Sequence, residues 1–126
     1  MFTTLALVAF GGAVGAGCRF LLGVGLLRLT GPTEMPLAIL TANVLGSFLM
    51  GVFVILAAQR GLTHLGPLVM TGLLGGFTTF SAFSLETVTL IERGQIGLAG
   101  LYVGLSVGLS VLGLMAGLWL ARGVLA

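Results

Sequence analysis

A run of small and hydroxylic residues interrupts the third long apolar segment of the chain. Residues 75–84 read GGFTTFSAFS and lie inside the stretch from Leu65 to Ile91, which otherwise has the character of a membrane helix. A glycine in a helix interior costs about 1 kcal/mol relative to alanine, and the hydroxyls that follow can bond nearby backbone instead. We therefore expect the helix to break at the Gly75-Gly76 pair. Freed carbonyls at mid-membrane are tolerated only where protein or a cavity covers them, and they can hold a cation.

Three phenylalanines follow the glycine pair at intervals of three. Phe77, Phe80 and Phe83 are expected on one side of the helix that continues after the break. Aromatic packing in the core of a helix bundle explains such a triplet. The alternative is that the positively polarised ring edges face a small anion.

Composition excludes a soluble domain. Of the 126 residues, 58% are hydrophobic and 6% charged, and the mean hydropathy is +1.26, which indicates an integral membrane protein. The five arginines are spread singly, so no basic cluster suggests nucleic acid as a partner. We find no cluster of histidine, cysteine and carboxylate typical of a transition-metal site and no nucleophile–base pair or phosphate loop, so we do not expect an enzyme.

Four segments are long enough to span a bilayer, which takes about 20 apolar residues each. We expect an all-α protein in which residues 1–126 form a single four-helix transmembrane domain. The short loops predict that neighbouring helices are antiparallel. The expected spans are Thr3–Leu22 with a weaker apolar continuation to Leu29, Pro36–Ala58, Leu65–Ile91 with the break near its centre, and Ile96–Ala121.

The arginines give almost no signal for orientation. With four spans, Arg60 and Arg122 lie on one side of the membrane, whereas Arg28 and Arg93 lie on the other. Such a balance leaves the positive-inside rule little to act on. The chain is therefore expected to insert both ways, so that two copies can pair head to foot and bring their breaks together.

Small residues recur every four positions, a spacing that lets helix backbones approach closely. The registers are Gly11, Gly15 and Gly23, with Arg19 in the same register, in the first span, Ser47 and Gly51 in the second, Gly72 and Gly76 in the third, and Gly100, Gly104 and Gly108 followed by Gly113 and Gly117 in the fourth.

The few polar residues inside the spans each allow two interpretations. Asn43 either makes a hydrogen bond between helices or donates one to a permeating anion. Tyr102, Ser106 and Ser110 form a stripe on the fourth span. Either its serines bond their own helix carbonyls, or the stripe is a hydroxyl track facing a pore.

Two charged residues lie near the ends of spans. Glu86, three residues after Phe83, is an intramembrane carboxyl and thus a functional candidate, unless the nearby interface wets it. Arg19 either snorkels to the interface or lines a vestibule that attracts anions.

These features together resemble the Fluc (CrcB) family of fluoride channels. The similarity covers essentially the whole chain in length, number of spans and loop pattern. Its most specific part is residues 75–84 with Glu86 following. It is joined by residues 11–15, GGAVG, with Arg19 in the first span, and by residues 42–47, ANVLGS, in the second.

The resemblance implies an antiparallel, dual-topology homodimer in the bacterial plasma (inner) membrane that exports fluoride passively through two pores. It implies a structural sodium ion, not transported, held at the dimer centre by the backbone carbonyls of Gly75 and Thr78. Phe80 and Phe83 would meet fluoride by their ring edges, and Asn43 would donate a hydrogen bond. The implied polar track comprises Thr79, Ser81, Tyr102, Ser106 and Ser110, with Glu86 near one mouth. Ala82 stands where many relatives carry a hydroxyl residue, so one rung of this track is absent.

Two alternatives stay open. One is a non-transporting membrane assembly or structural subunit, which predicts no anion-selective leak. The other is a small dual-topology, proton-coupled exporter of the small multidrug-resistance kind. Such a pump needs a carboxylate embedded in the membrane, typically in the first span. Here the first span has none, so only Glu86 is left for that role.

Overall fold

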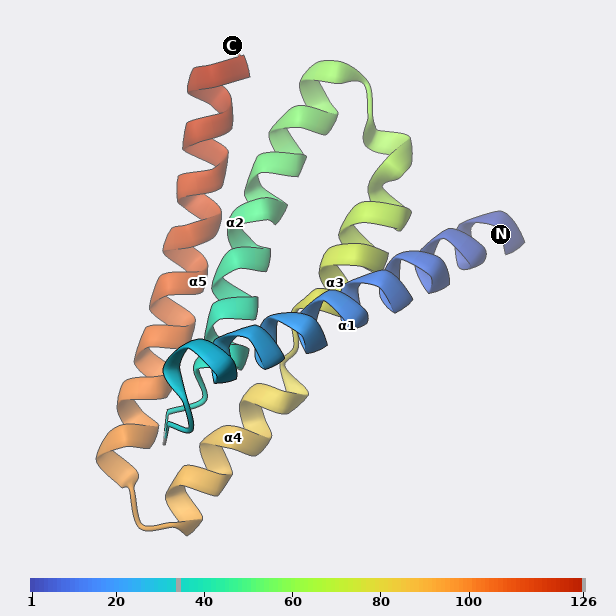
Figure 1. Cartoon of the computed structure of the whole chain (residues 1–126). Coiled ribbons are helices and arrows are strands. Elements are labelled where there is room, and N and C mark those ends of the chain that lie inside the picture. Colours follow the sequence, from blue (N-terminus) through green and yellow to red (C-terminus); the bar gives the residue numbers. More distant parts are fainter. Residues whose placement is uncertain (34, 126) are drawn as a thin grey trace.

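The computed structural model describes residues 1–33 and 35–125, and its membrane-length segments are helical. Four stretches are long and apolar enough to cross a membrane, which confirms the expected number of spans: Phe2–Thr30, Leu37–Arg60, Thr63–Glu92 and Ile96–Val124. The elements in chain order are α1 (Phe2–Thr30), α2 (Leu37–Arg60), the 3₁₀ turn η1 (Thr63–Leu65), the π-helix η2 (Pro67–Leu74), α3 (Gly75–Phe77), α4 (Ser81–Glu92) and α5 (Ile96–Leu125) (Figure 1).

The first helix is longer than the apolar pattern indicated. It runs to Thr30 and includes the whole stretch after Leu22, because that stretch holds no proline or other helix stop. Gly31 ends it with φ of 72°, a left-handed value that glycine adopts without strain, and its N–H donates to the Leu27 carbonyl at 2.8 Å.

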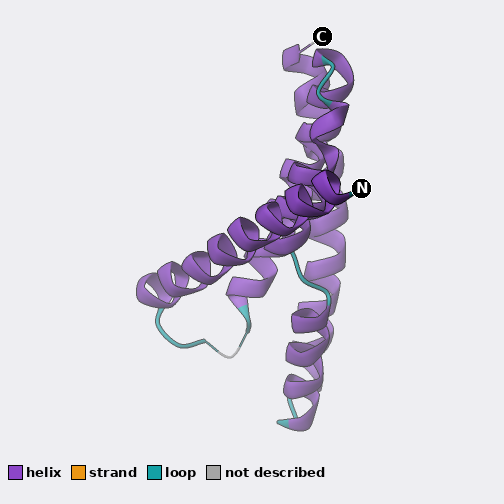
Figure 2. Ribbon diagram, turned by 90° about the vertical axis from the view of Figure 1, so that its right-hand side faces the viewer, coloured by secondary structure: helices purple, strands orange, loops and turns teal. Residues whose placement is uncertain are grey.

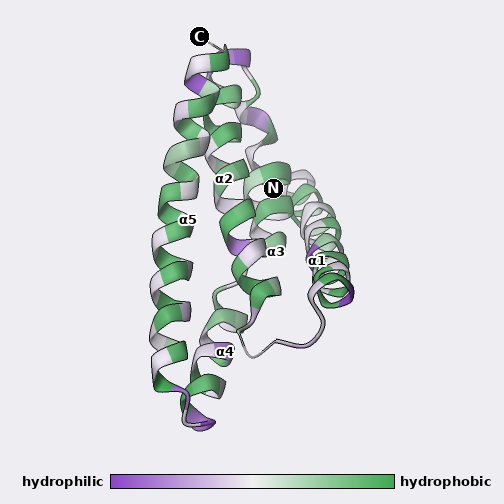
Figure 3. Cartoon of the chain, turned by 60° about the vertical axis from the view of Figure 1, so that its left-hand side comes forward, coloured by the Kyte–Doolittle hydropathy of each residue, from purple (hydrophilic) through white to green (hydrophobic). Residues whose placement is uncertain are grey.

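The spans pack as two pairs. Helices α2 and α5 run side by side, and α1 crosses η2 and α3 at a steep inclination (Figures 1 and 2). Consecutive spans reverse direction, as expected, although α1 is strongly inclined to the rest. Apolar residues cover all the spans, and polar residues gather at their ends (Figure 3).

Glycines permit both helix contacts. A Cβ at Gly51 would collide with the backbone of Leu114, and a Cβ at Gly117 would collide with the backbone of Phe48, so α2 and α5 meet backbone to backbone. Gly15 of α1 faces the Leu73 backbone in the same way, and a Cβ at Gly76 would lie 2.6 Å from the Gly12 carbonyl oxygen. The small-residue registers are thus confirmed as close contacts at Gly11 and Gly15 of the first span, Gly51 of the second, Gly72 and Gly76 of the third, and Gly113 and Gly117 of the fourth.

One predicted register packs against nothing in the described part of the chain. A Cβ at Gly100, Gly104 or Gly108 would meet nothing within 4 Å among the residues described. Gly100, Gly104 and Gly108 therefore form a glycine seam, a strip without side chains, on the outside of α5.

The third span is interrupted, but not at the glycine pair. Gly75 and Gly76 are helical, and the break covers Thr78 to Phe80 between α3 and α4. Thr78 is the first residue with extended backbone, at φ −87° and ψ 160°. The prediction placed the break too early because Gly76 serves the crossing with α1, where a side chain would not fit.

A small apolar core fixes the segment after the break. Leu90 of α4 packs with Leu40 of α2 and with Ala99 and Tyr102 of α5, all of them buried. This core holds α4 against α5 and thereby sets where the residues at the start of α4 lie.

Candidate functional site

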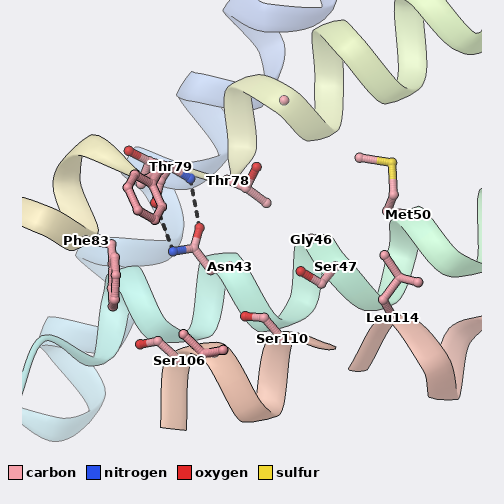
Figure 4. A pocket seen from close by; sticks show the side chains of 13 residues that line it. Asn43, Gly46, Ser47, Met50, Thr78, Thr79, Phe83, Ser106, Ser110 and Leu114 are labelled. Carbon is pink, nitrogen blue, oxygen red and sulfur yellow. Dashed lines mark hydrogen bonds between the residues drawn. The ribbon is translucent and has the colours of Figure 1, made fainter. Parts of the chain in front are cut away.

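A carboxamide from α2 bridges the break. The Asn43 Nδ2 donates to the Thr79 carbonyl at 2.9 Å, and the Thr79 N–H donates to the Asn43 Oδ1 at 2.8 Å (Figure 4). A continuous helix would pair both of these backbone groups within itself. Asn43 therefore replaces two helical hydrogen bonds at the residue where the helix stops. An asparagine amide has two N–H donors, so one remains after the bond to Thr79.

The side chain of Thr79 begins the next helix. Its Oγ1 accepts a hydrogen bond from the Ala82 N–H at 3.1 Å, the geometry of a helix N-cap. The Ser81 Oγ lies 3.5 Å from the same oxygen. The N–H, the carbonyl and the hydroxyl of Thr79 thus all make hydrogen bonds at the break. In the bond from Ala82 the Thr79 hydroxyl is the acceptor, so the hydroxyl proton of Thr79 is not used by that bond.

Because the Thr79 and Ala82 N–H groups bond to side chains, two backbone carbonyls lack the partners that they would have in a continuous helix. In an α-helix the N–H of Thr79 would donate to Gly75 and the N–H of Ala82 would donate to Thr78, because each amide bonds the carbonyl four residues earlier. Here Asn43 and the Thr79 hydroxyl take those amides. Among the residues that the structure describes, no hydrogen bond outside the helices reaches the carbonyl of Gly75 or Thr78.

An open groove of about 430 Å³ lies beside the break. Hydroxyl and amide groups of α2 and α5 line one wall, and the broken span lines the other (Figure 4). It gathers eight of the residues predicted from the sequence: Asn43, Gly75, Thr78, Thr79, Phe80, Phe83, Ser106 and Ser110.

Five lining residues were not among the predicted site residues: Gly46, Ser47, Met50, Val107 and Leu114. Ser47 lies four residues after Asn43 on the same helix face, a signal that sequence spacing did contain. Gly46 is required because a Cβ there would collide with the Thr78 methyl group.

Two of the three phenylalanines form a ring pair. The centroids of Phe80 and Phe83 lie 5.5 Å apart with the planes inclined by 47°, and Phe80 is 77% exposed at the edge of the groove. The expectation that Phe77 shares their face is wrong. Phe77 belongs to α3 and is buried, because the extended residues between it and Phe80 change the direction of the chain.

Four predicted residues do not line the groove. Tyr102 is completely buried behind Phe83, with ring centroids 5.3 Å apart. Ser81 is exposed next to Thr79, and Glu86 on α4 and Arg19 on α1 are half-buried.

Two hydroxyls near the groove lack a well-formed hydrogen bond. The Tyr102 Oη and the Ser106 Oγ are buried without such a bond in the described part of the chain, and the two hydroxyls are close neighbours on α5. A buried polar group left unpaired costs about 1–3 kcal/mol. Ser106 lines the groove, but its hydroxyl oxygen is covered.

Comparison with known proteins gives one consistent answer. Residues 6–118 match the family model described as CrcB-like protein, Camphor Resistance (CrcB). A protein of Roseobacter denitrificans named fluoride-specific ion channel FluC is 74% identical over 122 residues, 96% of this chain and 97% of the relative. Proteins with the same name from Ruegeria sp. and Agrobacterium fabrum are 64% identical over 125 residues and 47% identical over 120 residues, covering 99% and 94% of this chain and 99% and 95% of the relatives.

Proposed function

The chain belongs to the CrcB-like family, and from that premise we propose that it is a fluoride-specific ion channel whose pathway follows the groove beside the interrupted helix. Its relatives at 74% and 64% identity bear that function in their names. The observation that carries the location is the groove beside the break, which Asn43 and Ser110 line together with the ring pair of Phe80 and Phe83.

The chemistry of the groove suits a small, strongly hydrated anion. Such an ion gives up water only where other donors replace it, and the second N–H of Asn43 and the hydroxyl of Ser110 are available for this. The edges of Phe80 and Phe83 offer weak positive polarisation on the other side. No lysine or arginine lines the groove, so no fixed charge would trap the ion.

The polar track extends beyond the groove in this proposal. Tyr102 and Ser81 adjoin Phe83 and Thr79, and their hydroxyls, together with that of Thr79, continue the line of donors. Glu86 stands near one mouth, and Arg19 draws anions to a vestibule. The absent hydroxyl at Ala82 leaves Thr79 and Ser81 as the donors at that level.

We further propose that two copies form an antiparallel, dual-topology homodimer. The groove is open to the outside of the subunit, and Phe80 is largely exposed, so one chain alone does not enclose a pore. The unpaired glycine seam of α5 offers a surface for close contact. Balanced arginines permit both orientations in the inner membrane.

A structural sodium ion at the dimer centre fits the residues present. The carbonyls of Gly75 and Thr78 have lost their helical partners, and both residues line the groove. Neutral carbonyl oxygens at a helix break are suitable ligands for sodium. Each chain would supply two of these carbonyls, so the dimer would supply four.

Efflux from proteoliposomes tests the proposed function. Liposomes carrying the purified protein are loaded with potassium fluoride or potassium chloride and diluted into a medium without either anion, and valinomycin lets potassium leave with the anion so that charge does not stop the flux. We expect fluoride to leave down its gradient, without ATP or a proton gradient, while chloride stays inside. Equal rates for the two anions would contradict the assignment.

A further inference from the structure

We infer that the side chain of Asn43 is a positioning residue for the cation site, because it keeps the Gly75 carbonyl free by holding the amide that would otherwise bond it. The inference rests on the proposed sodium site and goes beyond it. It assigns to Asn43 a task that is separate from donating a hydrogen bond to fluoride.

The argument follows the hydrogen bonds at the break. The Thr79 N–H has two possible acceptors: the Gly75 carbonyl, four residues earlier, in a continuous helix, or the Asn43 Oδ1 in the observed structure. Asn43 also donates to the Thr79 carbonyl at 2.9 Å, so the peptide is held from both sides. Because the Thr79 N–H is bonded to Asn43, it does not compete with a cation for the Gly75 carbonyl oxygen.

The position of Asn43 makes this hold rigid. It lies on α2 between the buried residues Ala42 and Gly46, and Gly46 is in contact with the Thr78 side chain. The amide is therefore fixed by a helix that does not belong to the broken span. A side chain without hydrogen-bonding groups at position 43 would leave both backbone groups of Thr79 without a protein partner at a half-buried position. The span would then satisfy them by closing the helix, which would occupy the Gly75 carbonyl.

The Thr79 hydroxyl does the same for the second carbonyl. It accepts from the Ala82 N–H, the amide that a continuous helix would direct to the Thr78 oxygen. Two side chains thus divert the two amides that correspond to the two proposed sodium ligands.

Selective isotope labelling can observe the Gly75 carbonyl almost alone. The sequence has only two Gly-Gly pairs, Gly11-Gly12 and Gly75-Gly76. Labelling glycine with ¹³C at the carbonyl and ¹⁵N at the amide, and selecting directly bonded ¹³C–¹⁵N pairs by solid-state NMR in lipid, therefore yields two carbonyl signals. Gly11 lies within α1 and serves as the internal reference.

The comparison uses Asn43→Leu, Asn43→Asp and Ser47→Ala. In the unaltered chain we expect added sodium, but not N-methylglucamine, to shift the Gly75 signal and leave the Gly11 signal in place. In Asn43→Leu the Gly75 carbonyl should show the shift of a helix-bonded carbonyl without sodium and should not respond to sodium. Asn43→Asp keeps an oxygen that accepts from Thr79, so it should retain the response. Ser47→Ala, on the same wall but without a bond to the break, should retain it too.

Each outcome decides a separate point. A sodium-responsive Gly75 signal in Asn43→Leu would overturn the inference. Absence of a sodium response in the unaltered chain would overturn the proposed cation site, while the sodium-free comparison of the unaltered chain with Asn43→Leu would still test whether Asn43 frees the carbonyl. If Asn43→Leu does not assemble, Thr79→Val provides the second variant. It should raise the sodium concentration needed for half-maximal flux, and an unchanged requirement would contradict the diversion of amides.

Discussion

Phe83 and Tyr102 pack ring against ring, with centroids 5.3 Å apart and planes inclined by 39°. Phe83 belongs to the first turns of α4, and Tyr102 is completely buried on α5. Tyr102 thus supports from behind the ring that faces the groove. The position of the aromatic pair depends on the contact between two helices as well as on the break itself.

Tyr102 substitutions should separate support from hydroxyl chemistry. Tyr102→Ala removes a ring that is 0% exposed, and we expect the free energy of unfolding to fall by about 3–5 kcal/mol, as for other aromatic truncations in cores. Tyr102→Phe keeps the ring and removes a buried hydroxyl that lacks a well-formed hydrogen bond, so thermal stability in detergent should stay the same or rise, while fluoride efflux should slow because the proposed track loses a donor. Equal stability of the Ala and Phe variants would show that the ring does not support Phe83.

The crossing of α1 over the third span should not tolerate a methyl group. In Gly15→Ala the new Cβ would collide with the Leu73 backbone, which cannot rotate away. We expect a loss of about 1–3 kcal/mol in stability from overpacking, measured by thermal unfolding in detergent. Gly25→Ala on the same helix is the matched control, since nothing lies within 4 Å of that position. If Gly25→Ala lost as much stability as Gly15→Ala, the collision with Leu73 at the crossing would not be the cause.

Sodium should be needed for flux although it does not move. Without it, the carbonyls of Gly75 and Thr78 from two chains would face one another unpaired. With potassium and valinomycin present to carry the compensating charge, we expect fluoride efflux from proteoliposomes in which N-methylglucamine replaces sodium to fall to the rate of protein-free liposomes and to return when sodium is restored. Full efflux without sodium would exclude the structural ion.

Glu86 distinguishes a channel from a proton-coupled exporter. The residue is half-buried on α4 and does not line the groove, so Glu86→Gln should leave passive fluoride efflux close to that of the unaltered chain. An exporter that used this carboxyl as its proton carrier would stop transporting. Efflux measured with and without a pH gradient checks both points.

Much of the architecture follows from the lengths of the apolar segments and from the spacing of the glycines. Segment length and hydropathy predicted four spans, and the four-residue glycine registers predicted the contacts at Gly15, Gly51 and Gly117. These features are local, because each depends on one helix and on the size of one side chain.

The position of the break is not a local property. Glycine at 75 and 76 lowers helix propensity, yet both residues stay helical because α1 covers Gly76. The helix ends at Phe77, and Asn43, 36 residues away from Thr79 in sequence, bonds the backbone groups of Thr79 within the break. Sequence spacing could not pair Asn43 with Thr79, and the same displacement of the break explains why Phe77 was wrongly grouped with Phe80 and Phe83.

The most direct measurement compares the initial rate of fluoride efflux from proteoliposomes for Phe80→Ile and Phe2→Ile. Both phenylalanines are largely exposed, at 77% and 79%, but only Phe80 lines the groove. If fluoride passes beside the ring pair, Phe80→Ile abolishes efflux while Phe2→Ile transports like the unaltered chain. Equal, undiminished rates for the two variants would contradict a pathway along the interrupted helix.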